Sequence, residues 1–432
     1  MHKIQRIGVV FLAAFVLVMD VKPFQALATI TSERDEVPDR YQGLNIGIPD
    51  FPRRLRRELP EVSKTEKIDV GPLKLHPAYT QTVEFDDNIH LSDIDEDADV
   101  IFTETPALTA EVEVGDHRFE GGYGMEIVNF VKDEEENAIN HLAHLMGEFN
   151  FKDLQITVED SFEKSTSRLF SETSARDELI INSVDVMARY DRPHWAAETG
   201  WTHNTIDHRT PEFNNNDYNE DILALLGGYK ILPKTLLLAE LDLGTVYYDN
   251  NASNADQDYW QILGGIRGDL TSDITVTMKG GFQNRELGDV PGQGPQTDFD
   301  GMVADADVVY RLTDSDIFRG GYVRTVKTST FQNNSWYRQD KIYVSYRKRF
   351  LQKWYLTPQT SWQLNDYPEG STIGTVTKKR DDHFWQAGAS LRYKIREWLW
   401  TGVSYNFRLR NSDFDVLDYD SNRVVFDVSM AY

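Results

Sequence analysis

The 432-residue sequence contains no cysteine, and this absence excludes three kinds of chemistry. Without thiols the chain has no disulfide framework, no thiolate-bound metal and no cysteine nucleophile. Basic residues are also scarce, because 45 Lys and Arg stand against 70 Asp and Glu and leave a formal net charge of -25. Binding to phosphates of nucleic acid needs clustered basic side chains. We therefore expect no nucleic-acid partner.

Long apolar runs are scarce too, and the only sustained one lies at the N-terminus. Lys3 and Arg6 precede an apolar stretch at 7–19, and residues 26–28 (Ala-Leu-Ala) form a small-x-small cleavage site. Asp20 ends the run before it reaches the roughly 20 residues that a membrane-spanning helix needs. A retained N-terminal anchor is the alternative to a cleaved signal peptide. We divide the chain into a signal peptide (1–28), a periplasmic N-terminal segment (29–72) and a main domain (73–432).

The bulk hydropathy of the chain does not reveal the class of its main domain. The chain is 40% hydrophobic with a mean hydropathy of -0.50, which also suits a soluble protein. Such averages do not reveal a β-barrel in lipid, because every lipid-facing residue is followed by a polar residue that faces the lumen. The local pattern therefore has to decide between the two.

Period-two alternation, the pattern of β-strands, recurs along the main domain. In one segment Ile342, Val344 and Tyr346 alternate with polar or charged neighbours. These segments mostly run to about ten residues or more, the length of a tilted membrane strand, whereas sandwich strands have about five or six. A secreted β-sandwich or propeller is the alternative. We predict an all-β, antiparallel up-and-down transmembrane barrel of about eighteen strands, with sixteen as the alternative count. The segments are 75–85, 100–112, 117–130, 138–149, 153–163, 180–190, 194–202, 221–229, 235–248, 258–268, 272–284, 299–311, 317–327, 337–349, 353–364, 383–394, 397–409 and 422–432.

The links between these segments alternate in length. Outer-membrane barrels alternate short periplasmic turns with longer extracellular loops, so both ends of the barrel are predicted to lie on the periplasmic side. The short links are 113–116, 150–152, 191–193, 230–234, 269–271, 312–316, 350–352 and 395–396. The longer links are 86–99, 131–137, 164–179, 203–220, 249–257, 285–298, 328–336, 365–382 and 410–421.

The last segment ends the chain on an aromatic residue. Phe426, Val428, Met430 and Tyr432 share one face of it, as in the C-terminal strand that the barrel-assembly machinery recognises. We therefore predict that these four residues form an assembly signal.

Two short motifs near the start of the domain carry a resemblance to a known family. Residues 71–77 (Gly-Pro-Leu-Lys-Leu-His-Pro) and 85–89 (Phe-Asp-Asp-Asn-Ile) resemble the opening strand and first loop of the family described as "putative β-barrel porin 2". His141 to Phe149 and the turn Leu232-Pro233-Lys234 look like later elements of that family. The resemblance implies an outer-membrane barrel, in some relatives linked to exopolysaccharide export. It carries no catalytic residue over to this chain.

Charge is distributed unevenly along the domain. Residues 311–410 hold 18 Lys and Arg against 8 Asp and Glu, a local net charge of +10 that leaves -35 for the rest. If the polar sets face a water-filled lumen, one side of it is predicted to be acidic and the other basic, which would bias the passage of charged solutes. The alternative is that these charges only solvate the lumen and pair across it. The basic set is Arg267, Lys279, Lys341, Arg347, Arg392 and Arg408, and the acidic set is Glu120, Glu126, Glu148, Glu159, Glu198, Glu240 and Asp242.

We expect no metal site, cofactor or catalytic centre. The acidic runs at 93–99 and 133–136 lack the glycine and spaced glutamate of an EF-hand, and are expected to be solvated loops that could bridge through divalent ions to lipopolysaccharide. His141 and His144 are three apart, which places them on opposite faces of a strand, whereas His203 and His208 could meet in a loop. No G-x-S-x-G motif is present, so an outer-membrane enzyme is the least favoured function.

The sequence thus favours an outer-membrane channel of a Gram-negative cell, with exopolysaccharide secretion as a narrower hypothesis. Tyr343 and Trp400, both on the polar sets, could stack on sugar rings. A non-conducting structural or adhesion barrel with acidic extracellular loops is the alternative. The expected partners are outer-membrane lipid, lipopolysaccharide and the assembly machinery, together with a polysaccharide and a periplasmic export protein in the export hypothesis.

Overall fold

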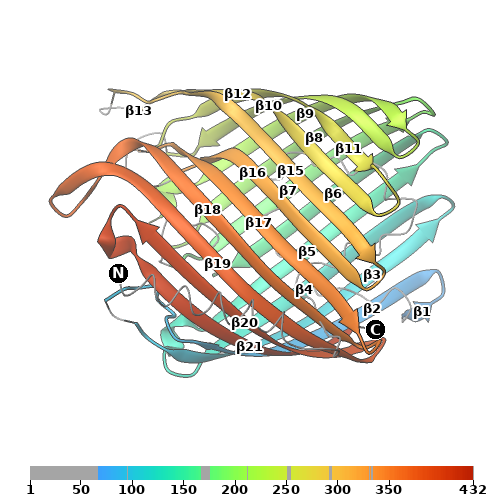
Figure 1. Cartoon of the computed structure of the whole chain (residues 1–432), viewed down its shortest axis with the longest axis horizontal. Coiled ribbons are helices and arrows are strands. Elements are labelled where there is room, and N and C mark those ends of the chain that lie inside the picture. Colours follow the sequence, from blue (N-terminus) through green and yellow to red (C-terminus); the bar gives the residue numbers. More distant parts are fainter. Residues whose placement is uncertain are drawn as a thin grey trace.

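The structure, a computed structural model, describes residues 67–94, 96–166, 176–211, 213–250, 254–290, 294–329, 331 and 334–431. Nearly all of them belong to one antiparallel sheet whose slanted strands curl into a barrel (Figure 1). The predicted signal peptide, the N-terminal segment up to residue 66 and Tyr432 lie outside the described residues. Within the described ranges, no helix is both long and apolar enough to cross a lipid bilayer.

The strands follow one another around the ring in chain order. The barrel strands are β2 (Leu73–Asp86), β3 (Asp99–Val114), β4 (His117–Phe130), β5 (Ala138–Asn150), β6 (Leu154–Ser165), β7 (Leu179–Asp191), β8 (Trp195–His208), β9 (Tyr218–Leu232), β10 (Thr235–Tyr248), β11 (Gln257–Asp269), β12 (Ile274–Leu287), β15 (Phe299–Thr313), β16 (Asp316–Thr328), β17 (Trp336–Phe350), β18 (Trp354–Ile373), β19 (Val376–Arg396), β20 (Leu399–Ser412) and β21 (Tyr419–Ala431). The smaller elements are β1 (Ile68–Val70), the hairpin β13 (Asp289–Val290) and β14 (Gly294–Pro295), and the 3-10 helices η2 (Glu134–Glu136), η3 (Asn214–Asn216) and η4 (Asp415–Leu417).

The sheet closes on itself. It has nineteen strands, and when the three-residue β1 is set aside, eighteen remain in the ring. β2 pairs with β3 on one side and with the last strand, β21, on the other, with Ala78 opposite Ala431 and Val83 opposite Phe426. The predicted fold class is therefore confirmed, and each predicted segment overlaps one barrel strand. Closure removes the sheet edges, whose unpaired backbone groups could not be satisfied in lipid.

The alternation of side chains sorts the strands into an outer and an inner face. On β10, Leu237, Leu243 and Tyr247 are exposed on the outside, whereas Glu240 and Val246 are buried on the inside. The same period of two continues on neighbouring strands, because directly paired residues point to the same face. Large apolar side chains therefore cover the outside, as a lipid environment requires.

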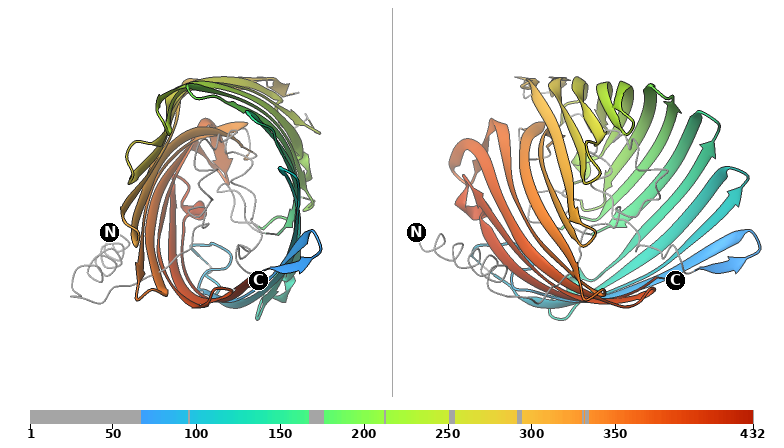
Figure 2. Two further views of the ribbon diagram at one scale, coloured as in Figure 1. Left: turned by 90° about the vertical axis from the view of Figure 1, so that its right-hand side faces the viewer. Right: turned by 45° about the vertical axis from the view of Figure 1, so that its right-hand side comes forward.

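Seen along its axis, the ring is elongated (Figure 2, left). β8 to β12, in green to yellow, form one narrow end, and the junction of β20 and β21 with β2 and β3 forms the other. At the first narrow end the inner faces pack against one another, with Ala196, Leu226, Leu236 and Leu238 in one buried cluster. The long sides of the ring are β4 to β6 and β15 to β19.

The link predicted as a loop at 365–382 is instead a hairpin. β18 and β19 continue for 20 and 21 residues and meet in a turn where Gly374 has φ 63°. The register shifts between Asp366 and Gly370, which marks where the apolar pattern breaks. The sequence prediction was wrong because a hairpin that extends past the lipid needs no apolar face, so the backbone ladder continues without the alternation. β8 likewise continues to His208, beyond the predicted end at residue 202.

Candidate channel lumen

Four of the predicted acidic residues lie along one long side of the ring. Glu120 and Glu126 are on the inner face of β4, Glu148 on that of β5 and Glu159 on that of β6. Glu120 is bonded to Arg118, and its Oε1 lies 2.9 Å from His144 Nε2. This long side of the lumen is therefore rich in carboxylates.

Two of the predicted basic residues lie on the opposite long side of the ring. Lys341 and Arg347 lie on the inner face of β17, where the paired residues across the ladder are Val323 and Ile317 of β16. In the ring of eighteen strands β6 is the fifth and β17 the fourteenth, so nine strands separate them in either direction. Carboxylates and cations therefore face each other across the short axis of the lumen.

The remaining acidic residues sit at the narrow end, together with two of the basic ones. The Arg267 guanidinium lies 3.3 Å from Glu198 Oε1, and Lys279 Nζ lies 2.9 Å from Glu240 Oε1. Glu198 and Glu240 are almost completely buried, with side chains 0% and 1% exposed. For these pairs the expected separation into an acidic and a basic side does not hold, since β8 to β12 lie together in the folded ring. Buried carboxylates require such partners.

This narrow end has a second inner layer, of which the sequence predicted only Asp242 as a site residue. Tyr259 donates its hydroxyl to Glu220 Oε1 over 3.0 Å, and the Arg285 guanidinium covers the Tyr259 ring at 4.4 Å. Asp242, from the predicted acidic set, accepts a 2.6 Å bond from Gln261 Nε2. These groups come from β9 to β12, so only the ladder brings them together. The one signal available in the sequence was their place in the polar sets.

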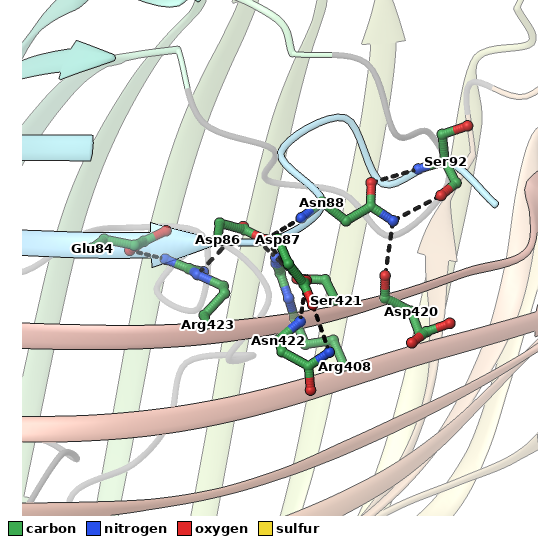
Figure 3. A network of polar contacts seen from close by, with 10 residues as sticks. All are labelled: Glu84, Asp86, Asp87, Asn88, Ser92, Arg408, Asp420, Ser421, Asn422 and Arg423. Carbon is green, nitrogen blue, oxygen red and sulfur yellow. Dashed lines mark hydrogen bonds and ion pairs between the residues drawn. The ribbon is translucent and has the colours of Figure 1, made fainter. Parts of the chain in front are cut away.

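The other narrow end is the seam between the first and last strands (Figure 3). Asp86 accepts bonds from Ser421 Oγ (2.9 Å) and from Arg408 (3.3 Å), and Arg423 pairs with Glu84. Of the predicted basic residues, Arg408 therefore lies in this network, while Arg392 lies 3.3 Å from Asp427 on the same side. The seam is thus joined by charged side chains as well as by the backbone ladder.

The Asp-Asn part of the first-loop motif anchors its loop to the seam. Asp87 accepts two bonds from Asn422, from the backbone N–H (2.6 Å) and from Nδ2 (2.7 Å). Asn88 Nδ2 donates to the carbonyls of Asp420 and Ser92 at 2.8 and 2.7 Å (Figure 3). Asn88 is completely buried, so an apolar residue could not replace it without leaving these carbonyls unsatisfied. The motif is therefore explained by barrel closure.

Arg176, three residues before β7, packs against this region. The Arg176 guanidinium covers the Phe130 ring at 4.8 Å, and its Nε lies 2.9 Å from Glu136. Burial lowers the pKa of Arg176, and the nearby carboxylates of Glu136 and Glu84 oppose that shift. The Arg176 side chain is therefore held by a charge pair and a ring contact.

The register of the paired strands also decides which face of the sheet each histidine occupies. His141 contacts Tyr123 on the outer face, while His144 points inward to Glu120, as predicted from their spacing. His203 lies beside Asp221 and His208 beside Asp177, so these two do not meet as the sequence allowed. They stand five apart on β8, which puts them on opposite faces.

One histidine and two carboxylates gather at the loop ends. His90, Asp133 and Glu136 hold their ligand atoms within 4.8 Å of one another. An imidazole and two carboxylates could ligate a divalent ion. In the structure, however, His90 pairs with Asp133 and Glu136 with Arg176, so the group is satisfied by charge pairs.

A closed antiparallel ring with an apolar outside and a charged inside is the architecture of an outer-membrane β-barrel of the porin class. The chain belongs to the family described as "Putative beta-barrel porin 2", whose model matches residues 183–432. The predicted family is therefore confirmed, although of the quoted motifs only the turn at 232–234 lies within the matched range.

Several solved structures are similar to this chain at low sequence identity, and one of them is described as an outer membrane protein. OpdK from Pseudomonas aeruginosa is 10% identical and is matched over 83% of this chain and 99% of that chain, with a TM-score of 0.47. OccK9 (OpdG) from the same species is 8% identical over 83% and 98%, with a TM-score of 0.48. OccAB3 from Acinetobacter baumannii is 12% identical over 84% and 100%, with a TM-score of 0.46. No curated protein matches the sequence.

Proposed function

We propose that this barrel is a passive channel for small hydrophilic solutes across the outer membrane. The observation that carries the proposal is the state of the inner face on β16 to β20. There Gln386 is exposed although it points into the ring, and the side chain of Arg319 is 46% exposed. Inward-facing polar groups that remain accessible indicate a water-filled lumen along this side.

The charges along the two long sides would give such a channel its selectivity. Carboxylates of β4 to β6 and cations of β17 produce a field across the short axis, in a space bounded by protein of low dielectric. Such a field orients dipolar solutes and biases the passage of ions. We therefore expect a channel that discriminates by charge and not only by size.

Single-channel recording on the full chain in planar lipid bilayers tests the proposal. We expect discrete, stable conductance steps in KCl that persist at low voltage. A barrel that shows the heat-dependent gel mobility of a folded outer-membrane protein but never conducts would contradict the channel function.

A non-conducting structural or adhesion barrel is the second candidate, and one observation favours it. Tyr218, Tyr248 and Tyr259 are buried inside the ring near the loop end of β9 to β11, in a cluster with Leu179 and Ile206. Such packing narrows the mouth at this narrow end. The absence of conductance together with intact folding would favour this second function.

Several narrower expectations remain predictions from the sequence. These are cleavage after residue 28, contact of the acidic loops with lipopolysaccharide, and recognition of Phe426, Val428, Met430 and Tyr432 by the assembly machinery. Exopolysaccharide export, with its polysaccharide and periplasmic partner, is left out of the proposal, because none of the similar structures named above supports it. We infer that the protein is not an enzyme, since its family is one of porins.

A further inference from the structure

The inner face of β18 to β20 carries neutral amides and hydroxyls in addition to charges. Across the ladder Ser361 pairs with Gln386, and the next inner row runs from Gln359 through Gly388 to Asn406. Directly opposed residues are about 5 Å apart, and residues two apart on a strand about 7 Å. These side chains therefore form one compact patch on the wall of the lumen.

The polar groups of this patch are not used by the fold. Among the described residues, the side chains of Gln359, Ser361, Gln386 and Asn406 have no hydrogen-bond partner, although polar side chains elsewhere on the inner face are extensively bonded. Ser390, one inner position along β19 from Gly388, is 4% exposed, and its Oγ also has no partner within the described ranges. A buried hydroxyl without a partner is costly unless a ligand or water satisfies it.

Gly388 lies at the centre of the patch, where the lack of a side chain lets Asn406 approach the backbone of β19. A Cβ placed there would come within 2.6 Å of Asn406 Oδ1 and 2.8 Å of the Tyr405 carbonyl oxygen. Gln359 and Asn406 flank Gly388 on the neighbouring strands, and the Asn406 amide occupies the space above it. The polar groups of the patch therefore lie close together on the wall of the lumen.

An aromatic pair continues the patch toward the short turns. Trp400, near the start of β20, and Tyr355 on β18 have ring centroids 5.0 Å apart on the inner face. The cations of Arg392 and Lys394 lie 5.6 and 5.4 Å from the Trp400 ring. Tyr355 is four residues from Gln359, a distance of about 13 Å along the strand.

From this arrangement we propose that the patch formed by Gln359, Ser361, Gln386, Ser390 and Asn406 around Gly388 is a binding site for saccharides inside the channel. Each amide offers both a donor and an acceptor, which matches the paired hydroxyls of a sugar, and a hydroxyl does the same. The rings of Tyr355 and Trp400 lie further along the strands and offer apolar surface to a later unit of the same oligosaccharide. This inference rests on the proposed channel function, because the site is reached through the lumen.

Maltohexaose, a neutral oligosaccharide, is the probe for the test, added to the full chain in a planar bilayer. We expect it to interrupt the current transiently. The mean blockade should be about tenfold shorter in the double variant Gln386→Leu and Asn406→Leu, the change that follows from losing two neutral hydrogen bonds. The matched control, Thr103→Val with Thr105→Val, removes inner-face hydroxyls from β3 and should leave the blockades unchanged.

The outcomes separate this inference from the channel function. A conducting wild type without sugar blockades, or with equal blockades in the Leu double variant, would overturn the saccharide site and leave the channel intact. If the barrel does not conduct, titration calorimetry of the detergent-solubilised barrel with maltohexaose decides instead. Heat that is lost in the folded Leu double variant and kept in the Thr103/Thr105 control supports the site, and the absence of heat in the wild type overturns it.

Discussion

At the scale of single residues, the Asp86 carboxylate links the two ends of the barrel. It accepts bonds from Ser421 and Arg408 and lies 3.7 Å from Arg423 Nε, while its own side chain is only 5% exposed. It also accepts a 3.0 Å bond from the backbone N–H of Asn88. One carboxylate therefore connects β2, β20, β21 and the first loop.

We predict that Asp86→Asn lowers the free energy of unfolding by about 1–3 kcal/mol, because charge-assisted bonds to two guanidinium groups are weakened in a buried site. Urea titration of the barrel in lipid vesicles, followed by tryptophan fluorescence, measures the change. The control is Asp258→Asn, an exposed carboxylate on the outer face, which should alter stability by less than about 0.5 kcal/mol. Equal effects of the two variants would refute a special role for the seam network.

The buried pair of Lys279 and Glu240 leads to a second prediction at this scale. Lys279→Met should cost about 3–5 kcal/mol, because it leaves a carboxylate that is 1% exposed without its cation. Adding Glu240→Leu should restore most of the loss, since a buried ion pair can be replaced by apolar side chains.

A double-mutant cycle of urea titrations measures this coupling. If the two substitutions simply add, the pair does not act as a unit. The result would then favour the alternative that these charges are solvated separately.

At the scale of elements, the hairpin of β18 and β19 is the part that the sequence did not predict. Its inner side holds Arg380, whose guanidinium lies 4.0 Å from the Phe331 ring and 4.4 Å from the Tyr367 ring. Arg380 and Tyr367 are completely buried, and Arg380 also pairs with Asp382 at 2.7 Å. The hairpin thus packs at the mouth of the barrel.

We predict that replacing 367–380 by Asn-Gly yields a folded barrel with a larger conductance. Asp366 and Asp381 are paired across the ladder, so a two-residue turn fits between them. Stability should fall by about 1–3 kcal/mol from the lost cation-ring contacts. Heat-dependent gel mobility and single-channel recording measure both effects. Replacing only 374–375 by Asn-Gly is the control, which should keep the wild-type conductance.

Most other elements were predictable, since a strand buried in lipid on one face must alternate. The segments 235–248 and 117–130 match β10 and β4 to the residue. Where the strands extend above the lipid, as in β8 beyond residue 202, the outer face is free to be polar. The sequence of such a stretch shows no alternation of apolar and polar residues, so it does not predict a strand there.

At the scale of the whole molecule, the charge on the two long sides should set ion selectivity. We predict that Lys341→Glu with Arg347→Glu shifts the reversal potential in a KCl gradient toward cation selectivity, because both side chains face the lumen opposite β4 to β6. The shift should shrink near 1 M salt, where the Debye length is about 3 Å.

The control for selectivity is Lys353→Glu, because Lys353 is exposed and lies in a short turn outside the strands. It makes half the charge change at a site away from the lumen wall. A reversal potential that follows net charge alone, and not the position of the charge, would contradict a field across the lumen.

The sequence by itself determined the barrel, because lipid outside and water inside impose an alternation that is visible in the order of residues. It also favoured eighteen strands over sixteen and predicted the inward position of the polar sets, since the alternation within each strand shows which residues share a face. Tertiary structure alone decided which charges meet. Arg267 and Glu198 are 69 residues apart, and only the curvature of the closed ring brings them together at its narrow end. For the same reason the seam of Asp86, Arg408 and Arg423 exists only once the last strand has paired with the first.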